Sequence, residues 1–370
     1  MIRNYIFYIL LLSSQAWGAL TFTTPLDRQI YQRNYFGQGT IIVLASTAGG
    51  TAVTAKVRAN PVSTYPGTDT GFVSVALIGG AVQGSIKASS GWYTLEIQTY
   101  DAGLAVVDDI TLGHVGIGDN FIIYGQSNAA NYFSPLITTA PDDRVNCRGV
   151  TNADPWRLCI DPMPTADNSL SSGWPIVGNQ LVGSNGFPVG FINVSMGNTS
   201  SNDWLPGFVN YARLKTALPF FPNCGFRAVL YDQGENDAAT SVTMATYIQN
   251  VTTTLTQLRN DAGCDVPMLI AIATHPNETT GANVIAAQTG LLGNYFKVYA
   301  GANTDSLNNT FRYDTVHFNT STGRNAFANL WFNAINALPT IRPGAPIVID
   351  SSSSKFCFFN GSAWKCTQGL

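Results

Sequence analysis

Short apolar segments alternate with helical periods from residue 120 onward, and this alternation restricts the fold more than any other feature of the sequence. Segments of strand length lie at 120–124, 187–194, 227–231, 268–274 and 296–300. Helical periodicity covers 244–258 and 327–338, and we expect Thr320 or Ser321 to cap the second helix. Strands that alternate with helices form a parallel sheet covered on both faces. The sequence therefore predicts an α/β domain over residues 114–340.

Residues 19–113 have a different pattern. Their β-rich runs lie at 40–44, 52–57, 71–78 and 92–98, and clusters of Gly, Pro, Ser and Thr separate them. This pattern predicts a small all-β sandwich domain in front of the α/β domain. Residues 341–370 read as a linker followed by a hairpin that a cysteine pair closes.

The first 18 residues are typical of a signal peptide. Arg3 precedes an apolar stretch at 5–12, and Ala16-Trp17-Gly18 forms a cleavage site of the small-x-small kind. The stretch is shorter than the roughly 20 residues that span a bilayer. We therefore expect a secreted or periplasmic protein with no membrane anchor after cleavage.

Six cysteines fit an oxidising compartment. Six cysteines allow about 15 connectivities, and pairing of sequence neighbours is the simplest of them. The predicted disulfides are Cys147–Cys159, Cys224–Cys264 and Cys357–Cys366. The cysteine and histidine spacings match no zinc site, so we expect no metal.

The charge content argues against a nucleic-acid partner. Charged residues make up 11% of the chain and its formal net charge is −3, with no run of Lys or Arg. Binding to nucleic acid needs a basic patch or stripe.

Polar residues follow three of the predicted strands, at 125–128, 195–199 and 232–237. Ligands of open α/β sheets bind outside the carboxyl ends of the strands, so we expect these turns to meet in one crevice. A fourth polar segment, at 314–317, lies just before the last predicted helix.

These turns contain every group that acyl transfer needs. Ser127 is the candidate nucleophile, and His317 is the candidate base because imidazole titrates near neutrality. Asp314 can orient the His317 ring from three residues away. The Ser127 and Gly197 N–H groups and the Gln233 amide are the candidate oxyanion donors. An α/β-hydrolase elbow fits less well, since Ala129 replaces its last glycine.

The motifs GQSN at 125–128, QGEND at 233–237 and DTVH at 314–317, with the segment 191–199, resemble the blocks of SGNH/GDSL-type hydrolases. The resemblance is to the sialate O-acetylesterase and acetylxylan esterase branch, and it covers roughly residues 110–338. It implies a flavodoxin-like three-layer α/β/α fold, an O-acetylated carbohydrate as substrate, and no cofactor.

Two departures from that pattern leave questions open. Relatives often carry two glycines where this chain has Gly197-Asn198. In some relatives the Glu of the QGE block is the proposed triad acid, so Glu235 competes with Asp314 for that role. The aromatic residues that flank the motifs are candidates for stacking on sugar rings, with core packing as the alternative; they are Tyr132, Trp204 and Tyr313.

The sequence therefore predicts an exported serine esterase that removes O-acetyl groups from glycans. Sialic acid is the first substrate expected from the resemblance, and acetylxylan or another polysaccharide is the alternative. A non-catalytic carbohydrate-binding surface protein is the alternative of another class. The complete set of Ser, Asp and His favours the enzyme, because an esterase fold that had lost its activity would have no reason to keep all three residues.

Overall fold

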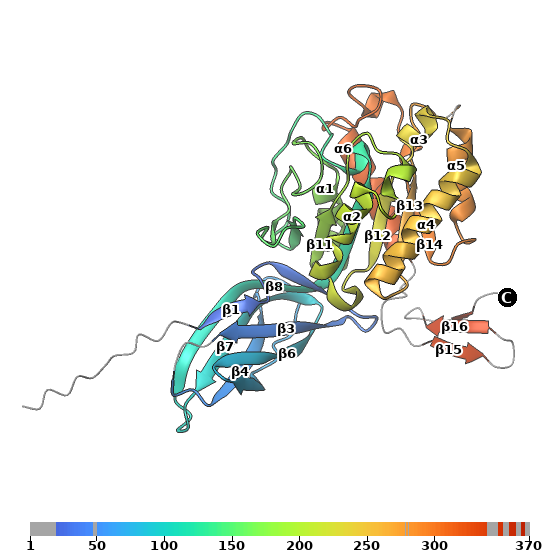
Figure 1. Ribbon diagram of the computed structural model, residues 1–370. Coiled ribbons are helices and arrows are strands. Elements are labelled where there is room, and N and C mark those ends of the chain that lie inside the picture. Colours follow the sequence, from blue (N-terminus) through green and yellow to red (C-terminus); the bar gives the residue numbers. More distant parts are fainter. Residues whose placement is uncertain are drawn as a thin grey trace, which may run out of the picture.

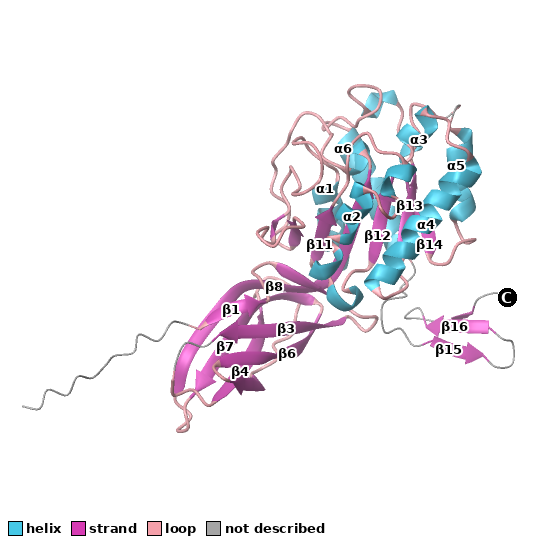
Figure 2. Cartoon of the chain, viewed as in Figure 1, coloured by secondary structure: helices cyan, strands magenta, loops and turns pink. Residues whose placement is uncertain are grey.

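The computed structural model describes residues 20–46, 50–277, 279 and 281–338, together with the backbone of 347–350, 355–359 and 364–366. The predicted signal peptide lies outside these residues. The described chain has an all-β part and an α/β part, which Figure 1 shows side by side and Figure 2 distinguishes by their helix content.

The all-β part contains seven strands and the beginning of an eighth. The seven are β1 (Thr21–Thr24), β2 (Gln29–Gln32), β3 (Gln38–Ser46), β4 (Thr54–Pro61), β5 (Val73–Ile78), β6 (Ala81–Ser89) and β7 (Gly91–Tyr100). Buried and exposed residues alternate along β3, so Ile41 and Val43 point into a core that also contains Val57 and Ile97. This one-sided burial is typical of antiparallel sheets with a solvated outer face.

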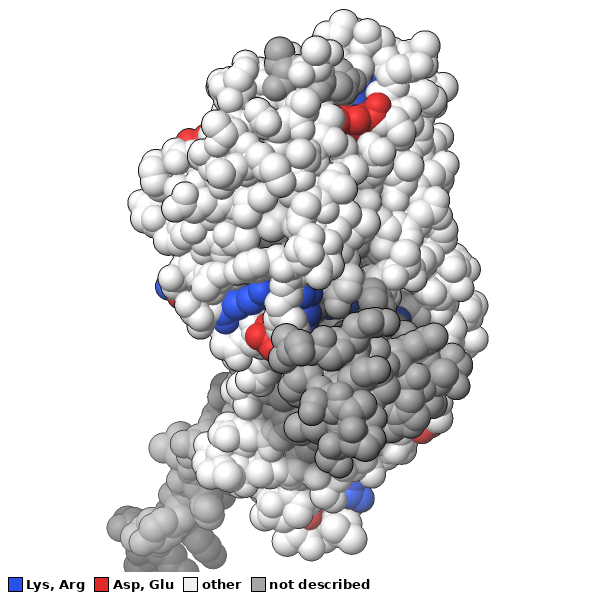
Figure 3. Space-filling model, turned by 90° about the vertical axis from the view of Figure 1, so that its right-hand side faces the viewer, with Lys and Arg blue, Asp and Glu red and all other residues white. Residues whose placement is uncertain are grey.

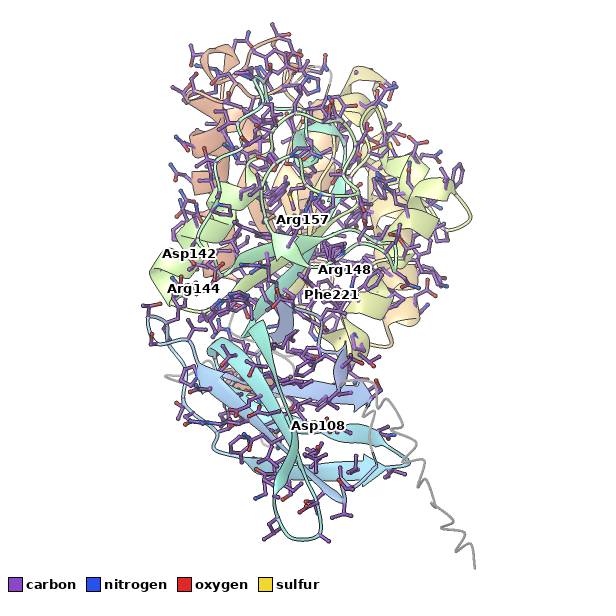
Figure 4. All side chains as sticks on the ribbon, turned by 90° about the vertical axis from the view of Figure 1, so that its left-hand side faces the viewer. Asp108, Asp142, Arg144, Arg148, Arg157 and Phe221 are labelled. Carbon is purple, nitrogen blue, oxygen red and sulfur yellow. A yellow bond between two sulfur atoms is a disulfide. The ribbon has the colours of Figure 1, made fainter. Side chains whose placement is uncertain are left out.

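Strand β8 (Val106–Gly125) belongs to both parts of the molecule. Its first half pairs with β7, and Figure 4 shows Asp108 on this half, among the strands of the all-β part. Its second half is buried on both faces and lies between two parallel neighbours. The sequence predicted a separate strand at 120–124, whereas one continuous strand carries the chain from one part into the other.

The α/β part is built on a largely parallel sheet with the strand order β14–β13–β12–β8–β11–β9–β10. Its other strands are β9 (Val145–Arg148), β10 (Arg157–Leu158), β11 (Val189–Asn193), β12 (Ala228–Asp232), β13 (Met268–Ile272) and β14 (Val298–Asn303). Only β10 runs antiparallel within this path. The predicted strands are thus confirmed, with small shifts at their ends.

Helices cover both faces of this sheet. Helices α1 (Trp174–Asn185) and α6 (Gly323–Ala337) share one apolar cluster, in which the Trp174 and Trp331 ring centroids lie 5.2 Å apart. Helices α2 (Val209–Lys215), α4 (Met244–Ala262) and α5 (Ala282–Leu291) supply the cluster of the other face. The fold is therefore the three-layer α/β/α arrangement that the sequence predicted.

The predicted cap of the last helix is wrong. Helix α6 begins at Gly323, and neither Thr320 nor Ser321 caps it. The Asn319 Oδ1 atom instead accepts the N–H groups of Thr322 at 2.9 Å and Gly323 at 3.0 Å. An asparagine carboxamide satisfies free N–H groups at a helix start as well as a hydroxyl does.

Of the predicted disulfides, Cys224–Cys264 is present. The prediction of a Cys147–Cys159 bond is wrong, because both residues are buried free thiols. Burial, followed by contact with Cys147, raises the pKa of the Cys159 thiol, so the apolar core keeps it protonated.

The third predicted disulfide falls in the backbone-only region. Strands β15 (Ile347–Asp350), β16 (Lys355–Phe359) and β17 (Trp364–Cys366) form a small antiparallel sheet in which Cys357 lies opposite Cys366. Their side chains lie outside the described residues, so this pairing stays a prediction.

Charged side chains are sparse on the surface. Figure 3 shows a face on which neutral residues cover most of the described area, in agreement with the low charge content of the sequence. Across the described ranges, no helix combines the length and apolar character needed to cross a membrane.

Candidate active site

A tight turn at the end of β8 carries Ser127. Gly125 has a φ of +143°, and a Cβ atom there would collide with the backbone carbonyl of Asp232. Glycine is therefore required for the ends of β8 and β12 to approach this closely. Ser127 begins a short 3₁₀ helix, η1 (Ser127–Ala129), and its exposed fraction is 5%.

The three polar turns meet at this point. The Gln126 N–H donates to the Asp232 carbonyl at 3.0 Å, and the Met196 N–H donates to the Gly125 carbonyl at 3.0 Å. Strand β8 lies between β11 and β12, so its carboxyl end is flanked by both of the other turns. This is the position at which open α/β sheets bind ligands.

A compact turn before α6 pairs Asp314 with His317. Thr315 is in the left-handed region with φ +71°, which lets Asp314 Oδ1 accept the N–H groups of Val316 at 3.0 Å and His317 at 2.7 Å. The other oxygen of Asp314 lies 2.7 Å from His317 Nδ1. Burial raises the pKa of the Asp314 carboxyl, but the hydrogen bonds from His317 and Val316 outweigh it, and the pKa is lowered overall.

Two tyrosines pack on the His317 ring. The Tyr132 ring is stacked on it at a centroid distance of 5.1 Å, and the Tyr313 ring at 6.0 Å. Tyr132 is half-buried, whereas Tyr313 is 46% exposed. Both rings therefore lie beside His317, where the sequence predicted contacts with substrate. Of the two, Tyr313 has the more exposed side chain.

The side chain of Asn128 joins the Ser127 turn to the His317 turn. Its Nδ2 donates to the Val316 carbonyl at 3.2 Å, so the residue after Ser127 is bonded to the residue before His317. The Ser127 hydroxyl and the His317 ring are not hydrogen-bonded to each other. Such bonds are often long without substrate and tighten in the Michaelis complex.

Glu235, the competing candidate acid, does not contact the histidine ring. Its Oε1 accepts the Asn128 Nδ2 at 2.7 Å, and the side chain is buried. Burial, and next the nearby Asp232 carboxyl, raise the pKa of Glu235 well above its usual range. The geometry therefore pairs His317 with Asp314.

The side-chain amide of Gln233 is bonded within the protein. The side chain is fully buried, and its Nε2 donates to Gln126 Oε1 at 2.7 Å, Thr199 O at 2.6 Å and Asp237 Oδ2 at 3.0 Å. These acceptors occupy both amide hydrogens. The expectation of an oxyanion donor at Gln233 is therefore wrong in this structure, where the residue holds the turns together.

The Gly197 N–H is also occupied. It donates to Asp167 Oδ2 at 3.0 Å, and the Tyr132 hydroxyl donates to the same oxygen at 2.7 Å. Hydrogen bonds to a charged carboxylate are stronger than those to a neutral oxygen, and in this structure the Asp167 carboxylate accepts the Gly197 N–H. The Ser127 N–H, by contrast, makes no hydrogen bond to any of the residues described. The Gly197 N–H could therefore act as the predicted oxyanion donor only after its hydrogen bond to Asp167 is broken.

Trp204 is not placed to stack on a sugar. Its side chain is fully buried, its Nε1 donates to Thr199 Oγ1 at 3.2 Å, and its ring packs edge-on against Tyr124. The expectation of substrate contact is wrong because the indole belongs to the apolar cluster under the turns.

Three residues at the site were missed by the sequence reasoning: Asn128, Asp167 and Arg213. Asn128 is the last residue of the GQSN motif, and its place in that motif could have marked it as a residue of the site. Asp167 lies in an irregular loop, and Arg213 on α2 donates from Nε to the Val194 carbonyl at 3.0 Å. No sequence pattern marks either of these two. Across the described ranges, no three His, Cys, Asp or Glu side chains are grouped so as to hold a metal.

Comparison with known proteins agrees with this architecture. Residues 118–333 match the family described as "carbohydrate esterase, sialic acid-specific acetylesterase". A carbohydrate acetylesterase from Xanthomonas citri is 15% identical with a TM-score of 0.53, and the match covers 93% of this chain and 82% of that one. A protein from Arabidopsis thaliana is 19% identical with a TM-score of 0.49, over 60% of this chain and 98% of that one. No curated protein matches the sequence.

The Xanthomonas citri structure supports the fold over nearly the whole chain, and the family match covers more than half of it. That match includes the three polar turns at the strand ends and the Asp314–His317 pair. The chain belongs to the sialic acid-specific acetylesterase family of carbohydrate esterases, and it is a carboxylic ester hydrolase with an SGNH-type fold.

Proposed function

We propose that this chain is a serine O-acetylesterase of glycans in which Ser127 is the nucleophile, His317 the base and Asp314 the acid. The observation that carries the proposal is the hydrogen bond from Asn128 Nδ2 to the Val316 carbonyl, at 3.2 Å. It holds the residue next to Ser127 against the residue next to His317. The carboxylate of Asp314 meanwhile occupies Nδ1 of the same ring.

The proposed reaction follows from this geometry. With Nδ1 bonded to Asp314, the free Nε2 of His317 takes the Ser127 proton as Oγ attacks the acetyl carbonyl. The Ser127 N–H stabilises the resulting oxyanion, and the Gly197 N–H joins it when substrate displaces Asp167. His317 then protonates the leaving sugar hydroxyl and activates the water that releases acetate.

We propose an O-acetylated sialic acid as the substrate, and two observations support it. The family description names sialic acid. Sialic acid also carries a carboxylate, and Arg213 lies near Asp167. Burial lowers the pKa of the Arg213 guanidinium, and the Asp167 charge partly opposes this shift. A planar guanidinium is suited to bind a carboxylate in a bidentate fashion.

The test is acetate release from p-nitrophenyl acetate, O-acetylated sialic acid and acetylated xylan, with wild type and Ser127→Ala compared. We expect wild type to act on the aryl ester and the sialic acid, and Ser127→Ala to lose about 10³-fold or more. Release from xylan alone would replace sialic acid as the substrate. Full activity in a folded Ser127→Ala variant would refute the proposed nucleophile.

We also propose that the protein is exported, on the strength of the segment at residues 1–18. Fractionation of a producing cell, with N-terminal sequencing of the product, tests this. A mature chain that begins near Ala19 outside the cytoplasm is the expected result, and an intact Met1 in the cytoplasm would contradict it.

A further inference from the structure

Glu235 contacts the turn that carries Ser127, the proposed nucleophile. It is the first residue of α3 (Glu235–Ala239), its exposed fraction is 4%, and its Oε1 accepts the Asn128 Nδ2 at 2.7 Å. Asn128 is fully buried and directly follows Ser127. The Glu235 carboxyl therefore fixes the rotamer of the side chain next to the nucleophile.

The same Asn128 amide also contacts the turn that carries His317. Its Nδ2 also donates to the Val316 carbonyl at 3.2 Å, and that carbonyl accepts a second hydrogen bond from Arg312 Nη1. Arg312 is held in turn by the Leu307 carbonyl at 3.1 Å and the Thr304 carbonyl at 3.0 Å. Of the two donors to Val316, Asn128 is the one that comes from the Ser127 turn.

We propose that Glu235 is a positioning residue, which orients Asn128 and thereby sets the distance between Ser127 and His317. The inference rests on the proposed roles of those two residues. It assigns Glu235 a task different from that of a triad acid. A carboxylate that orients the histidine must contact its ring, and Asp314 already does so at 2.7 Å from Nδ1.

The surroundings of Glu235 suggest that an amide can replace it. Its Oε2 and both oxygens of the Asp232 carboxyl are buried without a hydrogen-bond partner at short distance among the described residues. Trp331 and the Arg312 charge nevertheless lie close enough to lower the pKa of Asp232 against the larger effect of burial. Burial, and next the charge of Asp232, raise the pKa of Glu235 against the opposing charge of Arg312, which favours a proton on this pair of carboxyls. A glutamine at 235 keeps an oxygen for Asn128 and, like a protonated carboxyl, carries no charge.

The test compares Glu235→Gln, Glu235→Ala, Asn128→Ala and the double variant Asn128→Ala/Glu235→Ala on p-nitrophenyl acetate. We expect Glu235→Gln to retain kcat within about threefold. Glu235→Ala and Asn128→Ala should each lower kcat by up to about 10²-fold at nearly unchanged KM, because small misplacements of reacting groups cost that much. The double variant should lose no more than either single variant, since both remove one linkage.

The controls are Glu96→Ala and Asn294→Ala, which remove the same side chains away from the site. Melting temperatures show which variants fold, and if Glu235→Ala does not fold, Asn128→Ala and Glu235→Gln decide the matter. Full kcat in Asn128→Ala overturns the proposal, as does an additive loss in the double variant. A loss in folded Glu235→Gln as large as that in Asp314→Asn also overturns it, in favour of an acid role.

Ser127→Ala, measured in the same series, tests the proposed nucleophile separately from the proposed positioning role of Glu235. If Ser127→Ala is inactive while Glu235→Ala and Asn128→Ala behave as wild type, the positioning role alone is wrong. If folded Ser127→Ala is fully active, the proposed nucleophile is wrong, and the positioning role with it.

Discussion

The carboxylate of Asp314 binds His317 at two places: Oδ2 lies 2.7 Å from the ring Nδ1, and Oδ1 accepts the backbone N–H at 2.7 Å. A single aspartate therefore fixes both the backbone of the turn and the orientation of the ring. The left-handed Thr315 between them makes this double contact possible over three residues. The Glu235 carboxyl, by contrast, binds Asn128.

Asp314→Asn should lower kcat on p-nitrophenyl acetate by about 10²- to 10⁴-fold, because the amide can stabilise the wrong tautomer of His317 and no longer stabilises its charged form. Steady-state kinetics across pH measure this loss. Asp109→Asn, on the exposed face of β8, is the matched control and should behave as wild type. A folded Asp314→Asn variant with more than a tenth of wild-type kcat would contradict the assignment.

Arg213→Gln should raise KM for O-acetylated sialic acid by about 10- to 100-fold, since a hydrogen bond to a charged group contributes about 1.5–3 kcal/mol. KM for p-nitrophenyl acetate, which has no carboxylate, should stay unchanged. Lys215→Gln is the matched control, because Lys215 lies on the same helix α2 and pairs with Asp261 at 3.2 Å. An equal change on both esters would mean that Arg213 supports the fold rather than the substrate.

Stability should fall as pH rises toward the alkaline side, because two buried carboxyls hold protons in the folded state. Burial, with the charge of Asp232 second, raises the pKa of Glu235 to about 8, and burial raises that of Asp232 to about 7. Unfolded carboxyls release their protons near pH 4. Between pH 4 and 8 the folded state therefore binds more protons than the unfolded one, and stability present below pH 4 is lost by pH 8.

Thermal melting between pH 5 and 9 measures this slope in wild type and Glu235→Gln. The variant cannot ionise at position 235, so its melting temperature should decline less over this range. Glu96→Gln, on β7, should keep the wild-type slope. Identical slopes in all three proteins would show that Glu235 does not hold a proton in the folded state.

Removing the Cys224–Cys264 disulfide should lower the free energy of unfolding by about 4 kcal/mol, from the loop-closure entropy of a 40-residue separation. Urea unfolding of Cys224→Ala/Cys264→Ala against wild type measures the difference. The variant Cys147→Ser, which changes a buried free thiol, tests a different mechanism, since it introduces a hydroxyl into the core. An unchanged midpoint in the double variant would rule out the expected contribution.

The local patterns of the sequence were sufficient for part of the fold, and they missed elements such as β9, α1 and α5. The periods at 244–258 and 327–338 predicted α4 and α6, and the apolar runs predicted β11 through β14, because periodicity depends on residues a few positions apart. The Asp314–His317 pair was predictable for the same reason, since only two residues separate them. The helix cap at Asn319 was missed, because several neighbouring polar side chains could serve and only one geometry is realised.

The sequence by itself determined the alternation of strands and helices, the polar turns at the strand ends and the set of reactive side chains. The tertiary structure alone decided which of those side chains and N–H groups are free. Gly197 is bound by Asp167, 30 residues away in the chain, and Glu235 by Asn128, 107 residues away. Burial and hydrogen-bond partners arise from contacts between distant segments, and a local pattern does not contain them.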